Sequence, residues 1–244
     1  MRVAAVDCGT NSLRLLIAEG TRTLHREMRI VRLGQGVDRT GVLAPEAIER
    51  TRVALADYAA VIAHHDVTRT RMVATSATRD AANRADFVAM VHATLGVEPE
   101  VITGLDEAAL SYAGSVGTLP GLEGPVLLVD LGGGSTELVL GSNPMRAHSM
   151  DVGSVRMTER HLRDDPPTAE QIDAAVADVR AALDNASHDV PLDTGAPLVG
   201  VAGTVTTIAA IALGLERYEP DVIHGAHIAA AQVADVAGRL LSLG

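Results

Sequence analysis

Lysine and tryptophan are absent from the 244-residue chain, and its other aromatic residues amount to one Phe and three Tyr. Without lysine the chain cannot form a Walker-type phosphate loop, which needs its Lys, or a Schiff-base intermediate. All 20 basic residues are therefore arginine. Any anionic substrate must be held by Arg, by backbone amides or by a metal ion.

The chain also has little in common with nucleic-acid-binding, membrane or secreted proteins. Its net charge of −11 and its few stacking platforms argue against nucleic acid or an anionic membrane as a partner. No apolar run approaches membrane-spanning length, and Asp7 interrupts the first apolar stretch too early for a signal peptide. Cys8 is the only cysteine. We therefore expect a soluble cytoplasmic protein.

What the chain does have is a motif that occurs twice. Residues 3–15 (VAAVDCGTNSLRL) and residues 126–138 (VLLVDLGGGSTEL) share one pattern. Each copy predicts a β-hairpin whose tight turn exposes backbone N–H groups and carries an acid at its edge. Two copies predict two similar domains, residues 1–119 and 120–244, that present similar anion-binding loops to one interdomain cleft.

The rest of the chain alternates predicted strands and helices, which favours an α/β fold. In the first half we expect strands at 3–7, 13–18, 23–33, 71–74 and 101–102, and helices at 45–64, 80–95 and 104–114. A linker at 117–125 follows. In the second half we expect a hairpin at 126–141, strands at 145–152 and 197–201, and helices at 168–186, 204–213 and 229–241.

The loop Gly132-Gly133-Gly134-Ser135 is the strongest single candidate for an anion site. Glycines let a phosphate approach the backbone and allow positive φ, so that successive N–H groups converge on the anion. A plain hairpin turn could use the same residues, but Asp130 and Glu137 flank this one. Carboxylates beside a phosphate are unfavourable unless a cation lies between them, and Mg²⁺ is the usual one.

Four segments resemble, in order, the motifs of the exopolyphosphatase / guanosine pentaphosphate phosphohydrolase (Ppx/GppA) family. They are residues 7–12 (DCGTNS), 74–79 (ATSATR), 102–108 (ITGLDEA) and 130–137 (DLGGGSTE). The resemblance continues through 151–156 (DVGSVR) and 201–204 (VAGT), and it covers nearly the whole chain. That family belongs to the actin–hexokinase–Hsp70-like superfamily. The resemblance thus implies two similar ribonuclease H-like (actin-like ATPase) α/β domains with a cleft between them.

The resemblance also implies roles for individual residues. Glu107 matches the family's catalytic glutamate, which positions or deprotonates the attacking water, and Arg79 supplies a cation to the phosphate. Asp130 matches the acid associated with Mg²⁺ or Mn²⁺, Glu137 a second acid near the metal, and Asp7 takes the place of Asp130 in the first repeat. The matched phosphate-binding residues are Asn11, Ser12, Gly132, Gly133, Gly134, Ser135, Gly203 and Thr204.

The activity that the resemblance implies is Mg²⁺-dependent removal of terminal phosphate from linear inorganic polyphosphate. A phosphoanhydride needs charge neutralisation, alignment and one base, and the residues above supply all three. Three alternatives stay open: 5′-phosphate removal from guanosine pentaphosphate, a sugar kinase or ATP-driven chaperone on the same scaffold, and non-catalytic binding of polyphosphate or of guanosine penta- or tetraphosphate. The Glu107 motif speaks against the kinase and the chaperone.

The chain departs from the family pattern in two ways. Asp106 replaces the usual first Glu of its motif, and the family's second domain normally continues into a further strand and a closing helix. We therefore expect an incomplete second domain whose last helix exposes an apolar stripe, and a homodimer or a longer chain that covers it.

Two further clusters are open to interpretation. One is a group of arginines that would either guide a polyanion or merely balance surface acids: Arg22, Arg26, Arg29 and Arg32. The other is the pair His224 and His227, which would either ligate a metal or have no ligand at all.

Overall fold

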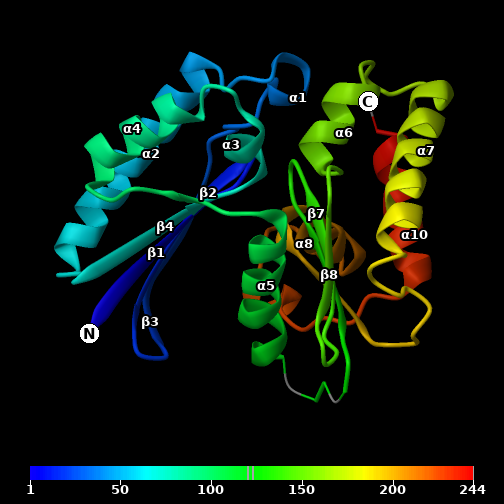
Figure 1. Cartoon of the computed structure of the whole chain (residues 1–244). Coiled ribbons are helices and arrows are strands. Elements are labelled where there is room, and N and C mark those ends of the chain that lie inside the picture. Colours follow the sequence, from blue (N-terminus) through cyan, green and yellow to red (C-terminus); the bar gives the residue numbers. More distant parts are fainter. Residues whose placement is uncertain (120, 123, 244) are drawn as a thin grey trace. The chain divides into compact units, whose positions relative to one another are not determined.

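The computed structural model describes residues 1–119, 121–122 and 124–243. The chain divides into two compact units, Met1–Gly104 and Leu105–Gly244 (Figure 1). The sequence suggested a boundary after residue 119. The two boundaries differ in where they place the helix Gly104–Ser115 (α5). The structure assigns almost all of it to the second unit, in whose core it packs.

The first unit contains a five-stranded sheet with the order β3-β2-β1-β4-β5. Its strands are β1 (Arg2–Cys8), β2 (Ser12–Glu19), β3 (Arg22–Ile30), β4 (Arg69–Ala74) and β5 (Glu100–Val101). Its helices are α1 (Val37–Thr40), α2 (Pro45–His64), α3 (Ser76–Asp80) and α4 (Arg84–Leu95). The first three strands form an antiparallel meander, and β4 returns parallel to β1.

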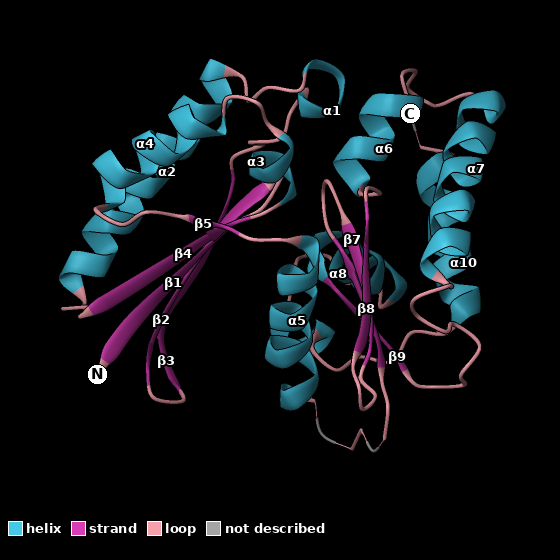
Figure 2. Cartoon of the chain, in the orientation of Figure 1, coloured by secondary structure: helices cyan, strands magenta, loops and turns pink. Residues whose placement is uncertain are grey.

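The core of the first unit lies between this sheet and the helices α2 and α4 (Figure 2). Strand β2 buries Leu13, Leu15 and Ile17 and leaves the residues between them more exposed, as the period of two in a half-buried strand requires. Tyr58 of α2 is fully buried, and its hydroxyl donates to the Leu13 carbonyl at 3.0 Å. This bond ties α2 to β2.

The second unit contains a four-stranded sheet with the order β8-β7-β6-β9. Its strands are β6 (Leu127–Leu131), β7 (Thr136–Leu140), β8 (Arg146–Met150) and β9 (Leu198–Val201). Its helices are α5, the 3₁₀ turn η1 (Val116–Thr118), α6 (Ser154–His161), α7 (Ala169–Ala186), α8 (Ala202–Ala212), α9 (Pro220–Ile223) and α10 (Ala230–Leu241). Again three antiparallel strands are followed by one, β9, that is parallel to the first.

Each half of the chain therefore repeats one topology, which confirms the prediction of an α/β fold with two similar units. Apolar side chains alternate between the two faces of the second sheet: Leu128 and Val139 pack against α5, whereas Leu127 and Leu138 pack in a separate core with residues of α7. Because β6 and β7 are covered on both faces, any polar side chain that they turn toward α5 lies in a largely buried environment.

Four short helices, α1, α3, α6 and α9, were not expected from the sequence. They have four to eight residues, too few to show a clear apolar period. Their bounds are set by backbone conformation and tertiary contacts instead. Helix α1, for example, begins after Gly36 and ends before Gly41, and both glycines have positive φ. The strand expected at 23–33 ends at Ile30, because the next two amides donate to the Asn11 carbonyl instead.

The last helix, α10, has an apolar stripe that is only partly covered. Val236 is buried, whereas Val233 and Leu240 are 39% and 42% exposed. A homodimer that covers this stripe stays a prediction. No helix in the described ranges has the length and apolar content that crossing a bilayer requires.

We expect Tyr58→Phe to lower the free energy of unfolding by about 1 kcal/mol, because the buried Leu13 carbonyl loses its hydroxyl donor. For a chain of this size the melting temperature should fall by about 2–4 °C. Tyr218→Phe is the matched control, since Tyr218 is 61% exposed. Equal melting temperatures for the two variants would contradict the role given to the Tyr58 hydroxyl.

Candidate active site

The two repeated turns close with the same hydrogen bond. The Gly9 amide donates to the Ser12 carbonyl at 3.0 Å, and the Gly132 amide donates to the Ser135 carbonyl at 3.0 Å. In both units this turn joins the first two strands of the sheet. The sequence repeat is therefore a repeat of local structure as well.

The first loop is tied to α3. The hydroxyls of Thr10 and Ser76 are 2.8 Å apart, and the Asn11 carbonyl accepts two amides from the segment after β3. Arg79, in the last turn of α3, donates to the Ile102 carbonyl at 2.9 Å. The fold of the first unit thus brings Asn11, Ser12 and Arg79 to neighbouring segments.

Asp7, the acid of the first repeat, forms an ion pair with its cross-strand partner Arg14 at 2.9 Å. Its counterpart in the second repeat has no such cation opposite it: Asp130 is paired across the strands with Glu137. Like charges directly opposite each other destabilise a sheet. The two repeats therefore share a backbone but differ in charge.

The carboxyls of Asp130 and Glu137 lie on the α5 face of the second sheet. Asp130 is two positions from Leu128 and Glu137 is two positions from Val139, so each acid shares a face with a residue that packs against α5. Ser111 of α5 donates a hydrogen bond to Asp130. Ser149 of β8 donates to Glu137 Oε1 at 2.8 Å. Neither serine was predicted as a site residue.

Glu107 completes this acidic cluster. It lies in the first turn of α5, four residues before Ser111, so both side chains share one helix face. The Glu137 side chain is only 1% exposed. Burial and the negative charge of Glu107 raise the pKa of Glu137 to about 8, although hydrogen bonds from Ser149 and Ser135 lower it in part.

The second loop is held against α6. The amides at the start of α6 donate to the carbonyls of Gly132 and Gly133 at 2.9–3.0 Å. A Cβ on Gly153 would lie 2.5 Å from the Gly133 oxygen, so only glycine allows this close approach. The sequence pointed to the three loop glycines, but it could not indicate that the segment after β8 holds them.

The predicted residues Gly203 and Thr204 lie in the first turn of α8, directly after β9. Strand β9 pairs with β6, and Val201 is the register partner of Asp130. The register therefore brings this turn to the end of β6 from which the glycine loop leaves. Ala202, between Val201 and Gly203, has a φ of 74°, which is a strained value for a residue with a Cβ.

A magnesium ion fits the residue chemistry of the acidic cluster. A buried carboxyl beside two other acids favours either a bound proton or a cation. In the described ranges no group of three or more His, Cys, Asp and Glu side chains is arranged to hold a metal ion. Mg²⁺ commonly uses only one or two carboxylates and takes its other ligands from water and substrate phosphates. Asp130 and Glu137 can supply that pair.

The arginines of β3 do not form one row. Arg29 is the register partner of the buried Leu13, and it is held by Glu27 and Asp57. Arg26 pairs with the exposed Leu16 and lies on the opposite face. This arrangement supports charge balance rather than a polyanion track.

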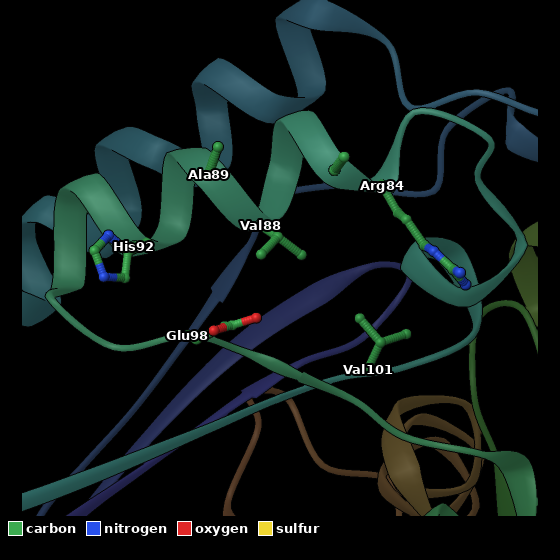
Figure 3. A pocket seen from close by; sticks show the side chains of 7 residues that line it. Arg84, Val88, Ala89, His92, Glu98 and Val101 are labelled. Carbon is green, nitrogen blue, oxygen red and sulfur yellow. The ribbon is translucent and has the colours of Figure 1, made fainter.

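A groove of about 500 Å³ lies elsewhere in the first unit, between α4 and the segment that enters β5 (Figure 3). Its lining residues are Arg84, Ala85, Val88, Ala89, His92, Glu98 and Val101. None of the residues predicted to bind phosphate or metal belongs to this lining. The predicted site residues therefore lie outside this groove.

Comparison with known proteins agrees with the motifs. The model of the Ppx/GppA phosphatase family matches residues 16–243. Exopolyphosphatase 2 of Mycobacterium tuberculosis is 49% identical over 256 residues, which cover 99% of this chain and 80% of that protein. The crystal structure of an exopolyphosphatase-like protein has a TM-score of 0.96 at 47% identity and covers 100% of this chain and 79% of its own. An Aquifex aeolicus family member has a TM-score of 0.75 at 34% identity, with 100% and 79% covered. By its sequence and its fold, the chain belongs to the Ppx/GppA phosphatase family.

Proposed function

We propose that this protein is an exopolyphosphatase, which hydrolyses the terminal phosphoanhydride bond of linear inorganic polyphosphate. The observation that carries the proposal is the cluster of Glu107, Asp130 and Glu137, with the loop Gly132–Ser135 joining the strands that carry the last two. The relative from Mycobacterium tuberculosis, named exopolyphosphatase 2, matches almost the whole chain and supports the same activity.

The mechanism needs one base and several fixed positive dipoles. Glu107 accepts a proton from water as the water oxygen attacks the terminal phosphorus. The phosphoanhydride P–O bond breaks, and the shortened polyphosphate leaves with the electron pair on its oxygen. Amides of the glycine loop stabilise the negative charge on the transferred phosphoryl group without reorganisation. Glu107 lies in the first turn of α5, near the positive end of the helix dipole.

Asp130 and Glu137 would hold Mg²⁺. When bound, the ion supplies charge neutralisation for the phosphate oxygens. It would also remove the cost of burying Glu137 ionised, since a cation stabilises the charged carboxylate. Ser111 and Ser149 orient the two carboxyls by donating hydrogen bonds to them.

We expect Glu107→Gln to lower kcat on polyphosphate by about 10²–10⁴-fold, because the amide keeps the shape of the side chain but cannot accept a proton. Phosphate release at saturating polyphosphate measures this loss, and polyphosphate binding should persist. Asp106→Asn, in the same helical turn, is the control and should keep most of the activity. Near-normal turnover of Glu107→Gln would remove Glu107 from the mechanism. Guanosine pentaphosphate and ATP assayed in parallel identify the preferred substrate, and a preference for either would contradict the proposed one.

Phosphate release should stop in excess chelator and return with added Mg²⁺ or Mn²⁺. In Asp130→Asn the metal concentration needed for half-maximal activity should rise by about 10–100-fold, because one carboxylate charge at the metal is lost. Asp193→Asn removes an exposed acid and serves as the control. Full activity in chelator would exclude the metal from the reaction.

Glu137 should also give the metal-free protein a distinct pH dependence of stability. Its pKa rises from about 4.5 in the unfolded chain to about 8 in the folded protein. The folded state therefore binds more protons between these values, and its contribution to stability falls as the pH rises through this window.

Glu137→Gln should abolish that fall, so its melting temperature should exceed the wild-type value by a margin that grows up to about pH 8. Each kcal/mol corresponds to about 2–4 °C in a chain of this size. Glu216→Gln, at an exposed glutamate, should show no such trend. A difference between Glu137→Gln and wild type that stays constant with pH would show that Glu137 is not raised in pKa.

A further inference from the structure

The carbonyls of the three loop glycines, Gly132, Gly133 and Gly134, all accept hydrogen bonds from α6, but not all from the same kind of donor. The Ser154 amide donates to Gly132 O at 3.0 Å, and the Val155 amide donates to Gly133 O at 2.9 Å. Backbone groups of the helix therefore fix the first two peptide units. These bonds are independent of the side chains that α6 carries.

A side chain, rather than a backbone amide, donates to the third carbonyl, that of Gly134. Arg156 Nε donates to Gly134 O at 2.7 Å. The Arg156 side chain is only 12% exposed, and its Nη2 is 4.0 Å from Asp151 Oδ1. A short hydrogen bond from a largely buried side chain favours one orientation of the Gly134–Ser135 peptide.

This orientation decides where the loop amides point. In a planar trans peptide the C=O and N–H groups point in opposite directions. With three carbonyls directed to α6, the amides of Gly133, Gly134 and Ser135 are directed away from it. Within the described part of the chain, no backbone carbonyl or side chain accepts from these three amides. Converging amides without protein acceptors form the kind of concavity that binds phosphate.

The other end of α6 is fixed as well. Arg160 and His161 both contact Asp178 of α7, at 2.8 and 2.9 Å. Hydrogen bonds from His161 and Arg160 hold the pKa of Asp178 below its usual value. The helix that holds the loop is thus anchored at both of its ends, so a change at Arg156 acts on the loop rather than on a mobile helix.

We propose that Arg156 is a positioning residue of this site: it orients the Gly134–Ser135 peptide so that the Ser135 amide binds a substrate phosphate. The inference rests on the proposed phosphoanhydride hydrolysis. The Nε–H donor of Arg156 orients the peptide, whereas the positive charge of the guanidinium is dispensable for this role.

Three substitutions separate the donor from the charge. Arg156→Gln puts an N–H donor the same number of bonds from Cα as Nε but removes the charge. Arg156→Met keeps the length of the chain without a donor, and Arg156→Lys keeps the charge but has a carbon at the Nε position. Arg163→Met, at an exposed arginine just beyond α6, is the control.

We expect Arg156→Gln and the control to retain kcat/KM for polyphosphate close to the wild-type value. Arg156→Met and Arg156→Lys should lose about 10–100-fold, since one backbone donor at the phosphate is misdirected. Their melting temperatures should match that of Arg156→Gln, so that the loss cannot come from unfolding. An equal loss in Arg156→Gln and Arg156→Met would overturn the proposal, as would no loss in any variant.

Amide NMR without turnover distinguishes this inference from the proposed function. The Ser135 amide resonance of the ligand-free protein should shift in Arg156→Met but not in Arg156→Gln, and an unshifted resonance in Arg156→Met would overturn the inference. In wild type, metal-free tripolyphosphate should shift the Gly133, Gly134 and Ser135 amides. If it does not, the proposed phosphate loop fails, while the ligand-free shifts still decide whether Arg156 orients the peptide.

Discussion

Burial of the Glu137 carboxyl opposite Asp130 is the interaction on which the rest of the candidate site depends. The antiparallel register of β6 and β7 makes these acids direct neighbours, and α5 adds Glu107 to the same face. Two serine hydroxyls offset only part of the cost of burying this charge. This uncompensated negative charge is why we propose a cation at the cluster, beside a glycine loop that we propose binds phosphate.

The two units show how one backbone motif can serve two purposes. Both turns close with the same hydrogen bond, and both join the first two strands of a similar sheet. In the first unit Arg14 lies opposite Asp7 and balances its charge, whereas Glu137 occupies the corresponding place in the second unit. The residue opposite the repeated Asp therefore balances its charge in the first unit and adds a second acid in the second unit.

Two helices support the second loop in different ways. Helix α5 contributes side chains, Glu107 as the proposed base and Ser111 as a donor to Asp130. Helix α6 contributes mainly backbone, because its first amides bond to the loop carbonyls and Gly153 allows close packing. Side-chain contacts and backbone support at this loop therefore come from separate elements.

The sequence alone was sufficient for the α/β class and the repeated hairpin, because these follow from local patterns of apolar and glycine residues. Its resemblance to known motifs was sufficient for the family, and the roles of Glu107, Asp130 and Glu137 stay predictions from that resemblance. The tertiary structure alone decided the pairing of Asp130 with Glu137, the serines that bind them, and the contact of Arg156 with Gly134. Each depends on strand register or on hydrogen bonds between residues far apart in the chain, such as the 22 positions between Arg156 and Gly134. A period in the sequence cannot encode such contacts, since they form only when separate elements pack together.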